Sequence, residues 1–188
     1  NVDIGPIRQA WSGNAYFINQ MVNGVVDRRA VGTETRYASN GKNAFGLIDY
    51  DVSYKVLNVA MLNGSWVTEG TTVTLLADHR RTPYLQTTNS LFGTPNASLE
   101  HINAANESVL RAQAKAVTAT SDLVMAGALH AVTKDWQLGG DVRLNRISGT
   151  SATNCLVILP GTSTLFLNPN AITDASCSLQ AQPGTGNI

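Results

Sequence analysis

Long segments of alternating apolar and polar residues, separated by short turn signals, constrain the fold of this chain more than any other feature. In the segment 136–148, for example, Val142 falls on one face of the expected strand, whereas Asp141 and Arg143 fall on the other. A period of two residues is typical of a β-strand with two chemically different faces. The pattern predicts seven strands, at residues 14–21, 26–37, 44–54, 59–67, 71–81, 122–132 and 136–148.

The links between these strands differ in length in a regular way. Short links lie at 39–42, 68–70 and 133–135, whereas the two longest segments, 82–120 and 149–188, both follow odd-numbered strands. In an antiparallel meander, both long segments therefore leave the sheet at the same end. An outer-membrane β-barrel has this asymmetry, with short turns at its periplasmic end and long loops outside.

Strand length points the same way. The expected strands average about 10 residues, close to the 9–11 that a tilted membrane crossing needs and longer than the usual 5–6 of globular proteins. We therefore expect an all-β fold: an antiparallel meander of about seven long strands that forms part of an outer-membrane β-barrel, with a partly helical loop at 82–120. A soluble β-sandwich alternates in the same way and is the competing architecture.

The charge content limits the classes of function. Charged residues make up 14% of the chain, against about 25% in an ordinary soluble domain, and 13 Lys and Arg balance 13 Asp and Glu. Zero net charge argues against a nucleic-acid-binding protein, which needs a basic excess. A helical membrane protein is not expected either, because no apolar run reaches roughly 18 residues.

Most ionisable strand residues fall on one face, where we expect a ladder of opposite charges. In a barrel this face would line the interior, and in an open interior it would set the ion preference. The candidates are Arg28, Glu34, Arg36, Asp49, Asp51, Asp78, Arg80, Asp141 and Arg143. Although His79 follows Asp78, neighbours on a strand point to opposite faces, so we expect no catalytic residue. We also expect no metal ligand set, no cofactor and no enzyme activity.

Two cysteines, Cys155 and Cys177, lie in the irregular segment 149–188. They are either unrelated thiols or one disulfide that closes a loop of about 20 residues and stabilises the fold by roughly 3 kcal/mol. We favour the disulfide, which indicates an oxidising compartment. The whole chain, residues 1–188, is expected to be one incomplete β domain, with the loop 82–120 and a Cys-containing loop or tail at 149–188.

Five short motifs carry a family resemblance. They are Asp27 to Gly32, Leu47 to Asp51, Asp78 to Pro83, Leu85 to Leu91 and Trp136 to Val142. Over residues 14–148 the chain resembles the C-terminal β-barrel region of proteobacterial tetratricopeptide-repeat outer-membrane proteins. The resemblance implies an upstream helical-repeat region, further strands after this chain, no catalytic residues, and a role in export or surface assembly. The segment 149–188 departs from the family and is expected to be an external-loop insertion.

Two other functions stay open. The chain could be a processed fragment that self-associates into an extracellular, amyloid-like β-rich filament, because an odd number of strands leaves two unpaired edges and low charge favours stacking. A soluble β-sandwich binding module is the second alternative. The expected partners are therefore outer-membrane lipid or copies of the chain itself, and the expected location is the bacterial outer membrane or the cell exterior.

Overall fold

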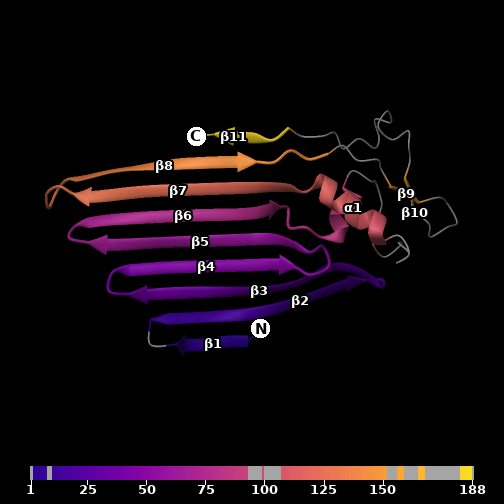
Figure 1. Cartoon of the computed structure of the whole chain (residues 1–188), viewed down its shortest axis with the longest axis horizontal. Helices are drawn as coiled ribbons and strands as arrows, with labels where there is room; N and C mark the ends of the chain where they lie inside the picture. Colours follow the sequence, from indigo (N-terminus) through magenta and orange to yellow (C-terminus); the bar gives the residue numbers. More distant parts are fainter. Residues whose placement is uncertain are drawn as a thin grey trace.

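The computed structural model describes residues 2–7, 10–92, 99, 107–151, 156–158, 165–167 and 183–187. They contain one large antiparallel sheet of nine strands, in the order β1-β2-β3-β4-β5-β6-β7-β8-β11 (Figure 1). The strands are β1 Val2–Ile7, β2 Trp11–Val22, β3 Val25–Ser39, β4 Lys42–Asp51, β5 Val56–Thr68, β6 Thr71–Thr82, β7 Ala119–Ala131, β8 Gln137–Ile147 and β11 Thr185–Asn187. A separate short hairpin consists of β9 (Leu156–Ile158) and β10 (Leu165–Leu167).

The predicted antiparallel meander is confirmed. Strands β2 to β8 correspond to the seven predicted strands, and each pairs with the next along the chain. The sequence pattern does not predict β1, whose pairing with β2 is irregular between Ile4 and Ile7. Pro6 lies in that irregular stretch, and an edge strand tolerates proline because its missing N–H is not needed there. The sequence also does not predict β11, which pairs only three residues with the end of β8.

Three hairpin turns have the same local chemistry. At Asn23-Gly24, Asn40-Gly41 and Glu69-Gly70 both central residues have positive φ. Two-residue hairpins of this type match the twist of the strands, and glycine adopts the required φ without steric strain. These turns lie where the sequence predicts them.

The turn between β4 and β5 corrects one predicted boundary. The alternation predicts a strand as far as residue 54, but β4 ends at Asp51. There the Asp51 carboxylate accepts a hydrogen bond of 2.8 Å from the backbone N–H of Tyr54, and Lys55 has a φ of 54°. A side-chain-to-backbone bond of this kind forms a turn without glycine or proline. The break therefore lies at 52–55 rather than at 56–58.

The connection between β6 and β7 is partly helical, as predicted. It contains the 3-10 helix η1 (Thr87–Leu91) and the helix α1 (Glu107–Val117). Within the described residues, no helix is long and apolar enough to cross a membrane. Helix α1 lies at the end of the sheet where β6 ends and β7 begins (Figure 1).

Two small buried clusters lie at this same end. One contains Val25 and Leu110, and the other contains Tyr54, Leu85 and Ala114. Both join the β6–β7 connection to the ends of the neighbouring strands. Large apolar side chains in the middle of the sheet stay exposed instead, such as Phe17 and Leu62, each 61% exposed.

Candidate functional site: two sheet faces and a cap

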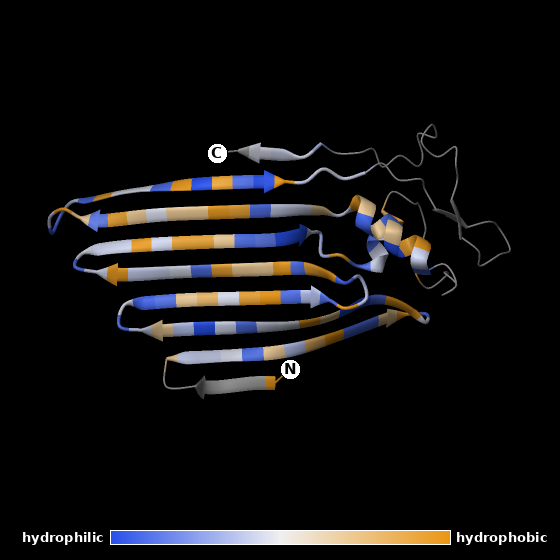
Figure 2. Cartoon of the chain, viewed as in Figure 1, coloured by the Kyte–Doolittle hydropathy of each residue, from blue (hydrophilic) through white to orange (hydrophobic). Residues whose placement is uncertain are grey.

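The strand register assigns each side chain to one of two faces, because directly paired residues point to the same side of a sheet. One face, which we call the apolar face, carries exposed large side chains along the middle of β2 to β8. They include Phe17, Val31, Ile48, Leu62, Leu75, Val124, Val142 and Leu144. Figure 2 shows the matching alternation of hydrophobic and hydrophilic residues along the strands.

The opposite face, which we call the polar face, carries all nine candidate charged residues. Their common side follows from the pairing of Asp49 with Gly32 and Val59, and of Asp78 with Met61 and Leu123. His79 lies on the apolar face, where its Nδ1 atom is 2.6 Å from Oδ1 of Asp122. The adjacent residues Asp78 and His79 therefore form contacts on opposite sides of the sheet.

The charges of the polar face pair mainly along single strands, not across them as a ladder would. Glu34 with Arg36, Asp78 with Arg80, and Asp141 with Arg143 are each two residues apart on one strand. The exception is Arg28 on β3, whose Nη2 atom lies 2.7 Å from Oδ2 of Asp49 on β4. The expected ladder is thus corrected to three pairs along strands and one cross-strand pair. Asp51 is bound by backbone N–H groups of its turn rather than by an arginine.

A tyrosine that the sequence does not single out completes the cross-strand pair. The hydroxyl of Tyr16 on β2 donates a hydrogen bond of 2.7 Å to Oδ2 of Asp49, two strands away. The ring reaches Asp49 by crossing Gly32 on β3, where a Cβ atom would overlap the ring. A glycine within a strand often marks such a close approach, and Gly32 is the sequence signal that could have indicated this contact.

The described part of the β6–β7 connection forms a cap, which we define as residues 83–92, 99 and 107–118. Asp27 on β3 fixes η1, since its Oδ1 atom accepts bonds of 2.8 and 2.7 Å from the backbone N–H and hydroxyl of Thr88. Thr87 donates to the carbonyl oxygen of Val26 over 2.7 Å. These bonds join residues 61 positions apart in the chain and hold the cap to the sheet.

The cap packs against the polar face. The ring of Tyr84 lies 5.0 Å from the guanidinium carbon of Arg28, a polar-face residue. At this end of the strands Asp49 is only 3% exposed, whereas its neighbours Ile48 and Tyr50 on the apolar face are 51% and 39% exposed. The two faces therefore differ in cover as well as in chemistry.

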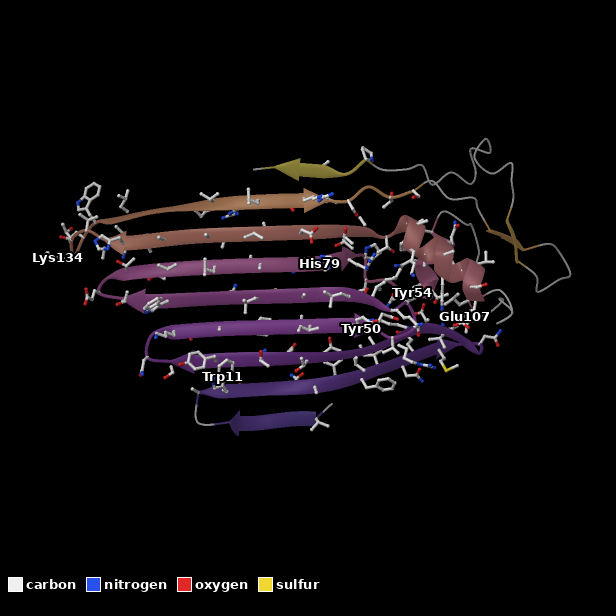
Figure 3. All side chains as sticks on the ribbon, viewed as in Figure 1. Trp11, Tyr50, Tyr54, His79, Glu107 and Lys134 are labelled. Atoms are coloured by element: carbon white, nitrogen blue, oxygen red, sulfur yellow. The ribbon has the colours of Figure 1, made fainter. Side chains whose placement is uncertain are left out.

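Tyr54 lies where the cap meets the sheet and is nearly fully buried. Figure 3 shows it beside α1. Its hydroxyl is 3.0 Å from the hydroxyl of Thr87, and its ring packs against Leu85 and Ala114. Burial raises the pKa of Tyr54 to about 12, although the bond to Thr87 and the charge of Arg111 act in the opposite direction.

The apolar face has two chemically different edges. The end opposite the cap carries the turns Asn40-Gly41 and Glu69-Gly70, and we call it the short-turn end. The aromatic edge lies there, with Trp11, Tyr37 and Trp66 on the apolar face and Trp136 immediately before β8. The rings of Trp11 and Tyr37 are 4.8 Å apart, and Nζ of Lys42 lies 5.1 Å from the ring of Trp66. At the cap end lies what we call the arginine edge. It consists of Asn19, Arg29, His79, Arg81, Asp122 and Arg146.

Both edges run obliquely across the strands. The row of directly paired residues that starts at Trp11 ends on β8 at Val142, six residues beyond Trp136. The row that contains Arg146 ends on β2 at Ala15, four residues before Asn19. The two edges shift in the same direction. Figure 1 shows the same stagger, because β6 to β8 extend further toward the short-turn end than β2 to β4, and in Figure 3 Lys134 lies beyond Trp11.

The geometry of the apolar band follows from these shifts. A mean shift of about five residues over the six strand intervals from β2 to β8 corresponds to a tilt of roughly 30°. The band extends over eight residue steps on β2, from Trp11 to Asn19, and over ten on β8, from Trp136 to Arg146. Measured across the tilted band, its height is therefore about 23–29 Å.

Cys155 and Cys177 lie outside the described residues, so their predicted pairing stays a prediction. Comparison of the chain with protein-family models, with curated proteins and with solved structures finds no match.

Proposed function

We propose that this chain is a non-enzymatic section of a bacterial outer-membrane β-barrel that serves export or surface assembly. The observation that carries the proposal is the oblique apolar band, which is bounded by an aromatic edge on one side and by charged residues on the other. In the proposed arrangement the apolar face contacts lipid, and the polar face and the cap line the interior.

The dimensions of the band support this assignment. Transmembrane barrels have strands tilted by about 35–45° and an outward apolar band about 25 Å tall. The band of this sheet has a tilt of roughly 30° and a height of about 23–29 Å. In a flat soluble sheet nothing requires the two edges of an apolar stripe to shift together, whereas a flat bilayer around tilted strands does.

The links of the sheet set the proposed orientation. The cap, the end of β8, the start of β11 and the turn Asn23-Gly24 lie at one end of the sheet. Asn40-Gly41 and Glu69-Gly70 are at the end opposite the cap. Since barrels carry short turns on the periplasmic side, we place the cap on the external side. The resemblance to tetratricopeptide-repeat outer-membrane proteins adds an upstream repeat region and further strands that complete the barrel.

A specific observation also favours the filament as a second candidate. All described side chains of β8 are exposed, and β11 covers only Asn145 to Ile147 on its outer side. The rest of that edge can pair with another strand, whether from the same barrel or from another copy. The β-sandwich fits less well, because in the described part of the chain no second layer covers Leu62 or Leu75, which are 61% and 58% exposed.

Two adjacent positions on β6 give a direct test. In a variant without native cysteines, we would introduce Leu75→Cys on the apolar face or Thr74→Cys on the polar face, attach an environment-sensitive fluorophore, and refold the chain into phosphatidylcholine vesicles. We expect a lipid-bound quencher to reduce fluorescence at position 75 and not at position 74. Equal quenching at both positions, or fibres that form in place of vesicle insertion, would contradict the barrel.

A further inference from the structure

The arginines of this chain fall into two groups. In the described residues Arg28, Arg36, Arg80, Arg111 and Arg143 each form an ion pair with a carboxylate. Three others have no carboxylate within ion-pair distance in that part of the chain: Arg29, Arg81 and Arg146. All three lie on the apolar face, whereas the paired arginines lie on the polar face or on α1.

The three unpaired arginines form one line. Arg29 pairs with Asn19 on β2, Arg81 with Thr120 on β7, and Arg146 with Asp122 on β7. The row of directly paired residues that joins Ala15 to Arg146 is the reference. Arg29 lies four residues from this row toward the cap, Arg81 lies two residues from it in the same direction, and Arg146 lies in it. They therefore follow the tilted edge of the apolar band. With about 4.8 Å between neighbouring strands and about 3.4 Å per residue, the Arg29 and Arg81 positions are about 16 Å apart and the Arg81 and Arg146 positions about 12 Å apart.

The other polar groups of this edge leave the arginines available. The Nε atom of Arg29 donates a hydrogen bond of 3.0 Å to Oδ1 of Asn19. The two terminal nitrogens of Arg29 form no hydrogen bond with another described residue. Asp122 lies directly opposite Arg146, but its carboxylate is bound to His79 at 2.6 Å. The edge thus presents three guanidinium groups against one carboxylate that is already paired.

We propose that the arginine edge binds anionic lipid headgroups that present a phosphate, where the apolar band meets the external surface of the membrane. This inference rests on the proposed barrel and names the chemistry of its lipid partner. A guanidinium group holds a phosphate through two parallel N–H donors, and its pairing with lipid leaves the alkyl stem on the apolar face. The spacing of the three arginines gives each one its own headgroup.

Spin-labelled lipids can measure this preference. The full chain is refolded into phosphatidylcholine vesicles that contain a trace of spin-labelled phosphatidic acid or phosphatidylcholine, and the lipid immobilised at the protein surface is quantified. One basic residue near the membrane surface attracts an anionic lipid by about 1 kcal/mol, which corresponds to about a fivefold preference for the anionic lipid over a neutral one. We expect immobilised lipid to be enriched in phosphatidic acid over phosphatidylcholine, and the enrichment to fall with added salt.

Matched variants separate the arginine edge from net charge. Arg29→Gln, Arg81→Gln and Arg146→Gln together should abolish the enrichment, whereas Arg36→Gln, Arg80→Gln and Arg143→Gln remove the same charge from the polar face and should preserve it. Replacing the three edge arginines with lysine should retain most of it, and circular dichroism checks the sheet in every variant.

The outcomes distinguish this inference from the barrel itself. Immobilised lipid without any preference for phosphatidic acid, or a preference that the edge triple variant retains, overturns the headgroup site and leaves the barrel standing. Inorganic phosphate that competes more strongly than sodium chloride of equal ionic strength would indicate a site for free anions and overturn the lipid assignment. Absence of immobilised lipid of either kind overturns both proposals.

Discussion

Replacing Gly32 with alanine tests whether the Tyr16 ring crosses β3 to reach Asp49. A Cβ atom at position 32 would overlap the ring, so the ring must move and its 2.7 Å bond to Oδ2 of Asp49 must break. Overpacking costs about 1–3 kcal/mol, and loss of a hydrogen bond to a charged group costs about 1.5–3 kcal/mol. Alanine returns about 0.5–1 kcal/mol through the lower backbone entropy of the unfolded chain. We expect Gly32→Ala to lower the free energy of unfolding by about 1.5–5.5 kcal/mol.

The assay is equilibrium urea unfolding in lipid micelles, followed by tryptophan fluorescence. The same substitution in a Tyr16→Ala background should be close to neutral, because the ring that it displaces is gone. Gly140→Ala on β8 is the matched control, since a Cβ there meets nothing within 4 Å. If Gly32→Ala costs the same with and without Tyr16, the crossing contact is refuted. An equal cost for Gly140→Ala would point to a general intolerance of alanine in the strands instead.

Three further outcomes are expected. Asp27→Ala removes both hydrogen bonds to Thr88, so it should lower the free energy of unfolding by about 2–4 kcal/mol and expose the cap to trypsin cleavage at Arg111. The control Asp135→Ala, in an exposed turn, should not increase this cleavage. Unchanged cleavage of Asp27→Ala would contradict the role of Asp27. Because the folded pKa of Tyr54 lies near 12, above its ordinary value of 10.0, its stabilising effect is complete below pH 10 and lost as the pH rises through about 12. A pH titration of cap protection should show this step in the wild type and not in Tyr54→Phe. Arg28→Gln leaves the buried carboxylate of Asp49 without its cationic partner and should lower the free energy of unfolding by about 3–5 kcal/mol. Arg143→Gln, in an exposed pair, should cost less than about 1 kcal/mol in the same urea unfolding assay. Similar values for the two variants would refute the difference in burial.

The strands and hairpin turns could be predicted because their signals are local. The alternation along β8 depends only on which side chains face which side, and Asn23-Gly24 carries its turn conformation in two residues. The end of β4 could not be predicted in the same way. There the turn depends on one carboxylate bond from Asp51 to the backbone of Tyr54, while the alternation of residue types continues past it.

Features that depend on distant pairing were not accessible. Strand β1 contains Pro6 and is a strand because β2 lies beside it, and β11 is a strand because it meets the end of β8. Side-chain alternation predicts that the nine charged residues share one face, but it does not predict which of them pair with each other. A carboxylate and an arginine two residues apart on the same strand are close enough to pair without a neighbouring strand, as Asp141 and Arg143 do at 2.6 Å. The cap depends on bonds across 61 positions, for which the sequence carries no local signal.

Measurements of depth in a bilayer distinguish an oblique apolar band from one that follows the strand register. Spin labels at positions 33 on β3, 75 on β6 and 142 on β8 lie close to midway between the two edges of the band, although the register places position 33 in a different row from positions 75 and 142. We expect oxygen and a water-soluble nickel complex to report the same depth, near the bilayer centre, at all three positions. Position 79, which shares the row of position 33, should report a depth at the membrane surface. Equal depths for 33 and 79, or equal exposure of all four positions to the water-soluble reagent, would contradict the oblique band.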